Sequence, residues 1–311
     1  MTRQVVATGF GGPEVLQIAE TEVPAPGVGE VRLAVRAIGV NPADVKMYSG
    51  AFGADPAALP IRLGYEAAGV VSEVGPGVTT FRAGDEVIAY RANGAYASDI
   101  VVAAEALSAK PPALGWPEAG GLSLAGATAV HALRVVSITG GDTVLVHGAA
   151  GGVGLLAVQL AAVRGARVIG TASAGKHDLL RSLGTEPVEY GPGLADRVRA
   201  LAPGGVQAAV DTVGTDEAVD VSLELVADRA RIVTIAAFAR AAAEGIALVG
   251  AGPGADPGTE VRNAARPELA RLAAEGTLRV IVARTYSLDD VAEAHREIAA
   301  GHVTGKLVLV P

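Results

Sequence analysis

The stretch that most constrains this chain is TVLVHGAAGGVG at positions 143–154, where an apolar run breaks into a cluster of glycines. Gly148, Gly151, Gly152 and Gly154 stand where a buried strand would end and a helix would begin. Glycines in such a turn let the backbone approach a pyrophosphate and aim helix-terminal amides at it. The stretch therefore predicts a dinucleotide-binding turn, and a glycine-rich structural turn is the alternative.

The match to the dinucleotide fingerprint G-x-G-x-x-G is imperfect. With Gly154 as the third glycine, Gly151 is the second, and Ala149 stands in place of the first. The strand before the turn and the strand–helix repeats after it supply the context that the bare pattern lacks. We therefore expect Gly151 and Gly152 to line a cofactor site.

The segment that would meet the adenosine ribose indicates which cofactor binds. NAD-specific folds usually place Asp or Glu about 20 residues after the glycines, to hold the ribose 2′-hydroxyl. This chain reads TAS there, with Ala172 at the expected position, Ser173 next and Lys176 three residues further on. A hydroxyl and a cation favour a 2′-phosphate, so NADPH is the predicted cofactor. The alternative is that Ser173 caps the next helix and Lys176 is merely solvated.

The pattern of apolar residues changes partway along the chain, and a length of 311 residues suits two domains. Residues 31–38, VRLAVRAI, alternate as a half-buried antiparallel strand does, and further strand-like runs make the first 115 residues β-rich, up to KPPALGWP. The runs TVLVH, RVIGT, AAVDTV and RIVTIAA then alternate with helix-like segments near 153–164, 176–183, 194–202 and 216–227. This pattern predicts an α/β domain whose doubly wound parallel sheet is covered on both faces.

The C-terminal segment resembles the first part of the chain in texture. It contains a predicted Asp-capped helix, a Gly301 stop and a final strand, so we expect the chain to return to the first domain. The predicted domains are 1–115 with 263–311, and 116–262 between them. The run IALVG at 246–250 is predicted to be an edge strand of the nucleotide sheet, and an exposed edge favours a homodimer.

Composition excludes several classes of function. The net charge of −8 argues against nucleic acid or an anionic membrane surface as a partner. There is no cysteine, which excludes disulfides, thiolate nucleophiles and cysteine-bound zinc. No apolar stretch is long enough for a membrane span, and the N-terminal segment lacks the apolar region of a secretory signal, so a cytoplasmic location is expected.

Beyond these features, the order of motifs resembles the medium-chain dehydrogenase/reductase superfamily, within its zinc-independent quinone oxidoreductase branch. The resemblance covers nearly the whole chain, through GGPEVLQIAE, GVNPADVKMYSG, GYEAAGVVSEVGPGVTTFRAGDEV, GAYASDIVV, LAGATAVHAL, the glycine turn, DTVG and TGKLVLVP. It implies a GroES-like β-rich catalytic domain, a Rossmann-type domain, and reduction of a small quinone or α,β-unsaturated carbonyl by NADPH.

The resemblance also implies that the catalytic zinc of related alcohol dehydrogenases has no ligands here. Those enzymes carry a cysteine and a histidine where this chain has Asn41 and Tyr65. A tetrahedral catalytic zinc needs three protein ligands, and neither residue is a plausible one. Quinones and activated alkenes are electrophilic enough to accept hydride without a Lewis acid, so the protein would supply orientation and polarity.

Roles for individual residues follow from the resemblance alone. It places Asn41 and Tyr65 beside nicotinamide and substrate, Thr128 near the carboxamide and Phe52 on the cleft wall. The alternatives are a turn residue for Asn41, a core residue for Tyr65 and a helix-interior hydroxyl for Thr128. Further cofactor contacts that the resemblance implies are Ala150, Val153, Tyr190, Val213, Ala236 and Ala237.

Two regions are not explained by the expected chemistry. Asp211 in VDTVG stands at a strand end and is expected to be structural rather than a general base. Residues 238–260 are rich in alanine, glycine and proline and match the family pattern poorly, so they leave the substrate open.

Two other functions compete with the reductase. One is a cofactor-binding accessory or structural protein with little turnover. The other is a short-chain dehydrogenase, which needs a Tyr-x-x-x-Lys pair, and no tyrosine here has lysine four residues later.

Overall fold

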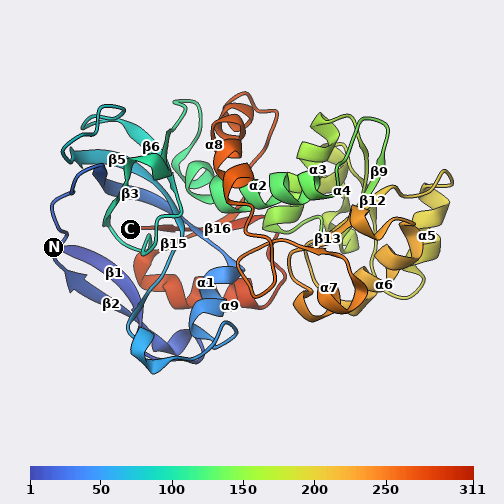
Figure 1. Ribbon diagram of the computed structural model, residues 1–311, viewed down its shortest axis with the longest axis horizontal. Helices are drawn as coiled ribbons and strands as arrows, with labels where there is room; N and C mark the ends of the chain where they lie inside the picture. Colours follow the sequence, from blue (N-terminus) through green and yellow to red (C-terminus); the bar gives the residue numbers. More distant parts are fainter. The chain divides into compact units, whose positions relative to one another are not determined.

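The computed structural model describes all residues 1–311, and the chain forms two compact units. Unit 1 comprises Met1–Leu124 and Arg266–Pro311, and unit 2 comprises Ala125–Ala265. Helices α2 (Trp116–Val135) and α8 (Thr259–Ala274) each run across a boundary between the units (Figure 1). The sequence-based boundaries fall at the start of α2 and within α8. No helix combines the length and the apolar character that a membrane span requires.

Unit 1 is built on two sheets that are antiparallel except for the parallel pair β15 and β16. The larger sheet has the order β15-β16-β3-β5-β6-β8, with β7 paired to β3, and the smaller has the order β2-β1-β4. The strands are β1 (Thr2–Ala7), β2 (Leu16–Thr21), β3 (Glu30–Val40), β4 (Ile61–Arg62), β5 (Glu66–Val74), β6 (Glu86–Tyr90), β7 (Asp99–Ala103), β8 (Leu107–Ala109), β15 (Val282–Ser287) and β16 (Lys306–Val310). Its helices are α1 (Pro42–Tyr48) and α9 (Val291–Ala299).

Strand β3 shows why these residues form a half-buried strand. Val31, Leu33 and Val35 are buried on one face, whereas Arg36 is exposed, as the alternating pattern predicts. The C-terminal strand β16 pairs antiparallel with β3, with Leu307 opposite Val40, so the end of the chain completes the sheet that the N-terminal segment begins.

Unit 2 contains a six-stranded parallel sheet. Its strands are β9 (Thr143–His147), β10 (Arg167–Thr171), β11 (Glu186–Val188), β12 (Ala208–Asp211), β13 (Ile232–Thr234) and β14 (Ala247–Leu248). The spatial order β11-β10-β9-β12-β13-β14 is the 3-2-1-4-5-6 order of a Rossmann-type fold, which confirms the predicted fold class. The connecting helices are α3 (Gly152–Val163), α4 (His177–Ser182), α5 (Leu194–Leu201), α6 (Asp216–Leu225) and α7 (Phe238–Glu244).

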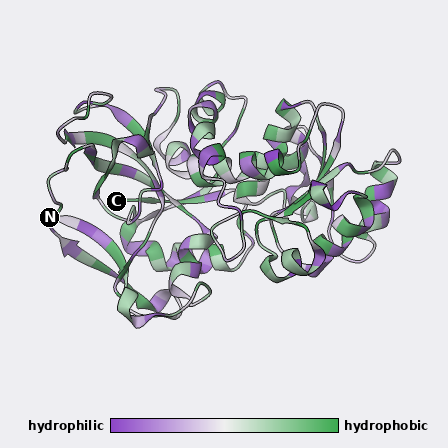
Figure 2. Ribbon diagram, viewed as in Figure 1, coloured by the Kyte–Doolittle hydropathy of each residue, from purple (hydrophilic) through white to green (hydrophobic).

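The parallel sheet is apolar because helices cover both of its faces. All five residues of β9 and all four of β12 are buried. Figure 2 shows the hydrophobic colour following these strands, with polar residues mainly on helices and loops. Six short 3₁₀ turns complete the chain: η1 (Pro13–Val15), η2 (Pro56–Ala58), η3 (Ala104–Ala106), η4 (Ala174–Lys176), η5 (Arg229–Arg231) and η6 (Leu288–Asp290).

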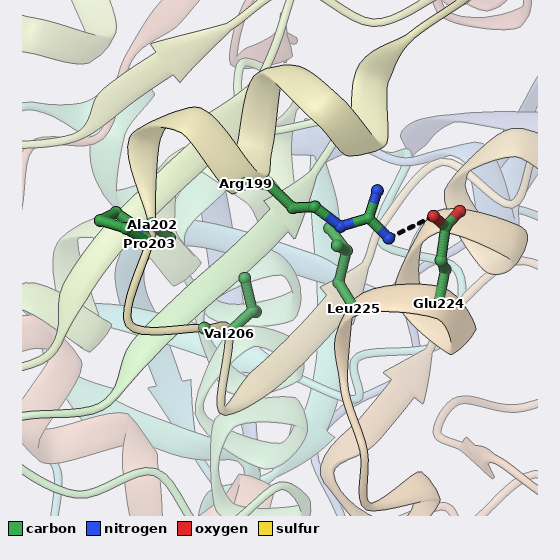
Figure 3. A pocket seen from close by; sticks show the side chains of 7 residues that line it. Arg199, Ala202, Pro203, Val206, Glu224 and Leu225 are labelled. Carbon is green, nitrogen blue, oxygen red and sulfur yellow. Dashed lines mark hydrogen bonds and ion pairs between the residues drawn. The ribbon is translucent and has the colours of Figure 1, made fainter.

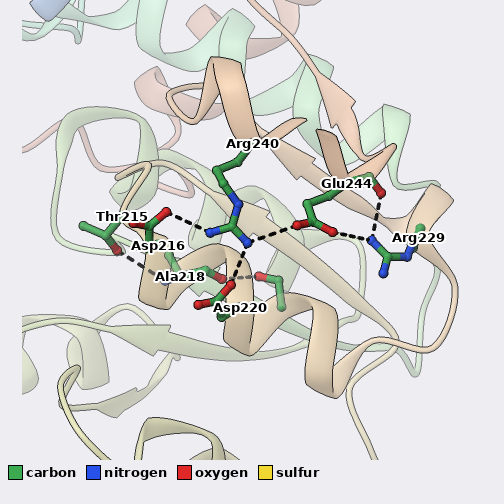
Figure 4. A network of polar contacts seen from close by, with 8 residues as sticks. Thr215, Asp216, Ala218, Asp220, Arg229, Arg240 and Glu244 are labelled. Atoms are coloured by element: carbon green, nitrogen blue, oxygen red, sulfur yellow. Dashed lines mark hydrogen bonds and ion pairs between the residues drawn. The ribbon is translucent and has the colours of Figure 1, made fainter. Parts of the chain in front are cut away.

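The divergent segment 238–260 begins as an ordered helix that is tied to its neighbour by charge. The Arg240 guanidinium on α7 donates to Asp216 at 2.8 Å and Asp220 at 2.6 Å, both on α6 (Figure 4). It also reaches Glu244 at 3.3 Å, and Glu244 pairs with Arg229 at 3.1 Å. The α7 helix is therefore anchored although its sequence departs from the family pattern.

Strand β14 is the edge strand of the sheet, as predicted, but its outer side is partly covered. Asp256 donates its amide to the Leu248 carbonyl at 2.8 Å, and its own carbonyl accepts from the Gly250 amide at 3.0 Å. The Asp256 carboxylate in turn lies 3.0 Å from His131 Nε2 on α2. The segment around Asp256 thus covers part of the outer side of β14, which belongs to the same divergent region.

The C-terminal helix α9 departs from its predicted cap. Asp290 occupies the N-cap position, yet its carboxylate makes no capping bond and instead accepts from the Ser287 hydroxyl. The prediction of a side-chain Asp cap is therefore wrong. The 3₁₀ turn η6 directly precedes α9, and the amide of Val291, the first residue of α9, donates to the Leu288 carbonyl of η6. Gly301 has a φ of +75°, a conformation that glycine adopts readily, and ends the helix as predicted.

Candidate active site

The glycine turn of unit 2 has the backbone geometry of a phosphate cradle. Gly148 follows β9 with a φ of +68°, and its carbonyl accepts from the Gly151 amide at 3.0 Å. A Cβ on Gly154 would lie 2.2 Å from the Gly148 carbonyl oxygen, so only glycine lets α3 start so close to the turn. This is the helix–strand packing that the third fingerprint glycine provides.

The start of α3 leaves donors for an anion. Gly151 is the N-cap and supplies no side chain, and the first backbone bond of the helix runs from the Leu155 amide to the Gly151 carbonyl at 2.9 Å. The preceding amides of Gly152, Val153 and Gly154 lie in the first turn, where a helix has no acceptors of its own. These residues fit a pyrophosphate, with the helix dipole favouring its charge.

The carboxyl ends of the parallel strands bring most predicted cofactor residues to one edge of the sheet. Each of them follows a different strand: Ala150 follows β9, Ser173 β10, Tyr190 β11, Val213 β12 and Ala236 with Ala237 β13. Ligands of open parallel sheets bind at this edge. Tyr190 and Val213 are about half exposed, whereas Ala237 is buried and donates its amide to Thr234 Oγ1 at 3.0 Å.

The position after β10 carries no acidic side chain. Ser173 is half-buried and occupies the N-cap position of η4, but its hydroxyl makes no capping bond. Lys176 is half-buried at the end of η4, and its amide donates to the Ser173 carbonyl at 2.9 Å. Ser173 and Lys176 therefore lie within one short loop, which η4 forms.

Asp211 is structural, as expected. It is buried at the end of β12, and Oδ1 accepts from the amides of Val213 and Gly214, each at 2.9 Å. Oδ2 accepts from the Thr234 hydroxyl at 2.7 Å. The carboxylate thus shapes the two loops after β12 and β13.

In unit 1, Asn41 belongs to a buried polar cluster rather than to an open surface. It is 2% exposed at the start of α1, and its Nδ2 donates to Glu66 Oε1 at 3.0 Å and more weakly to the Gly39 carbonyl at 3.3 Å. Lys306 donates to Asn41 Oδ1 and to Glu66 Oε1. The Asn41 carboxamide is therefore held on both sides.

A second set of buried groups continues from α1. Asp44 Oδ2 accepts from the Asn41 amide and from the Tyr96 hydroxyl, each at 2.9 Å. His295 Nε2 lies 3.1 Å from Tyr96 Oη, and its Nδ1 lies 2.8 Å from Tyr48 Oη. Because Tyr96 gives its single proton to Asp44, it accepts from His295 Nε2, and Tyr48 must donate to Nδ1.

Burial governs the protonation of this set. It raises the pKa of Asp44 to about 7, against the lowering effect of the Tyr96 hydrogen bond. It lowers the pKa of His295 to about 4, so the imidazole is neutral near pH 7. It also raises the pKa of Tyr48 to about 12.

The remaining predicted residues of the site are Tyr65, Phe52 and Thr128. Tyr65 is half-buried before β5, stacks edge-on against Tyr90 at 6.0 Å, and makes no hydrogen bond through its hydroxyl. Phe52 is 42% exposed in the loop after α1. Thr128 is buried within α2 and belongs to unit 2, although it does not follow a sheet strand.

Sequence reasoning missed Glu66, Lys306, Asp44, Tyr96 and His295. Two signals were available: a glutamate at the head of an apolar strand, and one of only four lysines placed directly before LVLV. No pattern in the sequence joins these residues, because hydrogen-bonded partners among them lie up to 240 positions apart.

A surface pocket elsewhere in unit 2 lies away from this chemistry. Its volume is about 270 Å³, and it is lined by Arg199, Ala202, Pro203, Val206, Glu224 and Leu225 (Figure 3). These residues precede β12 and β13, so the pocket lies at the amino edge of the sheet, opposite the glycine turn. No cluster of three or more His, Cys, Asp or Glu side chains is arranged to hold a metal ion.

Comparison with known proteins agrees with this architecture. The family described as alcohol dehydrogenase GroES-like domain matches residues 27–123, and the family described as zinc-binding dehydrogenase matches residues 183–309. A quinone oxidoreductase of Pseudomonas aeruginosa is 36% identical over 333 residues, covering 100% of both chains.

Two solved structures are similar over the whole chain. The quinone oxidoreductase of Escherichia coli, complexed with NADPH, has a TM-score of 0.87 at 32% identity and covers 100% of both chains. A structure described as an NAD-dependent alcohol dehydrogenase has a TM-score of 0.87 at 32% identity and covers 99% of both chains. The chain belongs to the medium-chain dehydrogenase/reductase superfamily and, within it, to the quinone oxidoreductase family.

The buried histidine yields a prediction on stability. His295 binds its proton more weakly in the folded protein, with a pKa of about 4, than in the unfolded chain, with a pKa near 6.5. The unfolded chain therefore gains the proton first as pH falls, and the contribution of His295 to the free energy of unfolding, complete above about pH 6.5, is lost toward pH 4. Its maximal slope is about 1.4 kcal/mol per pH unit.

Replacing His295 by Gln should remove this loss, so that as pH drops from about 6.5 to 4 the free energy of unfolding of the variant falls less, or rises more, than that of the parent, because glutamine is not charged by acid. Urea denaturation of the parent and the variant across this range measures the difference. The raised pKa of Asp44 acts in the opposite direction over part of the range, so the comparison is made between variant and parent. Identical slopes would show that His295 is not held neutral.

Proposed function

We propose that this protein is an NADPH-dependent, zinc-independent reductase that acts on a small quinone or an α,β-unsaturated carbonyl compound. The observation that carries the proposal is the edge of the parallel sheet, where the glycine turn and the loops after four further strands converge with no acidic side chain after β10. Membership of the quinone oxidoreductase family supports the same chemistry.

Residues of unit 2 would hold the cofactor. The α3 amides near Gly152 and Val153 would bind the pyrophosphate, and Ser173 with Lys176 would bind the 2′-phosphate. Tyr190, Val213, Ala236 and Ala237 would line the rest of the binding edge, with Thr128 near the carboxamide. When bound, NADPH supplies a hydride to an electrophilic carbon.

Residues of unit 1 would orient the acceptor. The Tyr65 hydroxyl has no partner within the protein, so it is the donor that a substrate carbonyl oxygen would accept from. Asn41 would act beside it through the N–H that now makes the longer 3.3 Å bond to the Gly39 carbonyl. Phe52 is exposed and would contribute an apolar wall. A hydrogen bond to the oxygen strengthens as negative charge develops there, and it therefore favours the transition state over the bound substrate.

The alternative is a cofactor-binding accessory or structural protein of the same fold with little turnover. Consumption of NADPH with a graded panel of quinones and enones distinguishes the two functions. Activity with any acceptor supports the reductase, and binding of NADPH without turnover on the whole panel supports the alternative.

The cofactor preference is a direct test of the loop after β10. NADPH should bind more tightly than NADH, and Lys176→Ala should reduce the preference about tenfold, because a charge-assisted bond to phosphate contributes roughly 1.5–3 kcal/mol. Arg181→Ala is the matched control, since it removes an exposed cation on the next helix that pairs with Asp178. Equal dissociation constants for the two cofactors in the parent, measured by calorimetry, would contradict the proposal.

The chemistry is tested by chelation and by removal of one hydroxyl. Turnover should survive exhaustive treatment with EDTA, because Asn41 and Tyr65 stand where zinc ligands would be needed. Tyr65→Phe should lower kcat by about tenfold or more with little change in NADPH affinity, because the hydroxyl acts on the acceptor. Zinc-restorable loss of activity would refute the zinc-independent part, and a Tyr65→Phe variant with parental kcat would remove Tyr65 from the mechanism.

We also propose that the chain forms a homodimer in the cytoplasm, as the edge position of β14 favours. Asp256 already occupies Leu248 and Gly250 on the outer side, so pairing of two copies would include this segment or displace it. Light scattering at micromolar concentration should give twice the mass of one chain. The mass of a single chain would show that the capped edge does not pair.

A further inference from the structure

The end of one strand and the beginnings of two others meet at a buried polar triad in unit 1, formed by Asn41, Glu66 and Lys306. Asn41 directly follows β3, Glu66 is the first residue of β5 and Lys306 is the first of β16. These strands are neighbours in the larger sheet, in the order β16-β3-β5. The exposed fractions of Asn41, Glu66 and Lys306 are 2%, 0% and 4%.

The hydrogen bonds of the triad form a closed set. Lys306 Nζ donates to the Val40 carbonyl at 3.1 Å, to Glu66 Oε1 at 3.2 Å and to Asn41 Oδ1. These three bonds use all three protons of the ammonium group. Glu66 Oε2 accepts from the Leu124 amide at 2.7 Å. Both charges are therefore compensated and hydrogen-bonded, which a buried pair requires.

Backbone packs closely around the triad. A Cβ on Gly39 would lie 2.3 Å from Glu66 Oε1 and 2.6 Å from the Gly120 carbonyl oxygen, so the backbone passes directly against the carboxylate. The stem of Lys306 passes Gly121, where an added Cβ would lie 3.4 Å from it. Rotation of the Asn41 carboxamide by 180° would place its NH₂ against the ammonium group and its oxygen against the carboxylate, which electrostatics disfavours.

We propose that Lys306 and Glu66 are positioning residues that lock the Asn41 carboxamide in one orientation, with Oδ1 toward the ammonium group and Nδ2 toward the carboxylate. Lys306 also withdraws charge from Oδ1, which makes the Asn41 N–H groups stronger donors. The N–H with the longer bond is then the one that is available to a substrate oxygen. The lock is a property of unit 1 alone, and its effect on turnover rests on the proposed function.

The lock can be measured without cofactor, on the full chain. Asn41, Asn93 and Asn263 are the only asparagines, so ¹⁵N-asparagine labelling gives three side-chain NH₂ signals. Lys306→Met combined with Glu66→Gln removes both charges together and leaves no unpaired buried ion. The Asn41 side-chain protons should exchange with water at least about tenfold faster in this variant, while those of exposed Asn93 stay unchanged.

Lys110→Met with Glu86→Gln is the matched control, because it removes a second Lys–Glu pair of unit 1, at 2.8 Å, that does not contact Asn41. This control should leave Asn41 exchange as in the parent. Fast exchange of Asn41 in the parent, or equal exchange in parent and triad variant, would overturn the lock.

Turnover provides the second readout. The triad variant should lower kcat by about ten- to a hundredfold, as expected for a misplaced catalytic group, with little change in KM for NADPH. The same two substitutions in an Asn41→Ala background should cause no further loss, because they act through Asn41. A further loss there would overturn the positioning role. Altered exchange with parental turnover in Asn41→Ala would support the lock and refute only the catalytic role of Asn41.

Discussion

The fully buried carboxylate of Glu66 constrains how unit 1 can assemble. An isolated ionised group in a protein interior is strongly unfavourable, so each oxygen must find donors. Lys306 and Asn41 supply them to Oε1 and the Leu124 amide supplies one to Oε2. These donors come from the end of β3, the start of β16 and the middle of α2, so the carboxylate is satisfied only when these parts of unit 1 have assembled.

This requirement links the two ends of the chain. The final strand does more than add apolar area to the sheet, since its first residue carries the only ammonium group that reaches Glu66. The apolar run Leu307–Leu309 is buried beside β3 and holds Lys306 in register with Asn41. The orientation of Asn41, a candidate catalytic residue, thus depends on Lys306 near the C-terminus.

Unit 2 forms its candidate cofactor site in a different way. Its binding edge relies on backbone rather than on buried charge: a glycine at positive φ, a second glycine that allows close packing, and helix amides without acceptors. Asp211 and Thr234 hold the neighbouring loops through hydrogen bonds to backbone amides. An edge of this kind suits a cofactor that is recognised chiefly by its phosphates, whereas in the proposed function polar side chains of unit 1 orient the acceptor.

Local patterns in the sequence predicted strands such as β3, β9, β10, β12 and β13, the helices α3 to α6, the edge position of β14, and the placement of the glycine turn and Ser173 at strand ends. Ala150, Tyr190, Val213 and Ala236 were expected from the family resemblance. Periodicity and glycine placement act over a few residues, and strand ends of a parallel sheet share one edge by construction. Only the tertiary structure revealed the Asn41–Glu66–Lys306 triad, the Tyr48–His295–Tyr96–Asp44 chain and the return of Asp256 over β14. Buried polar groups are paired by proximity in space, and no local periodicity records a partner that lies more than 200 residues away.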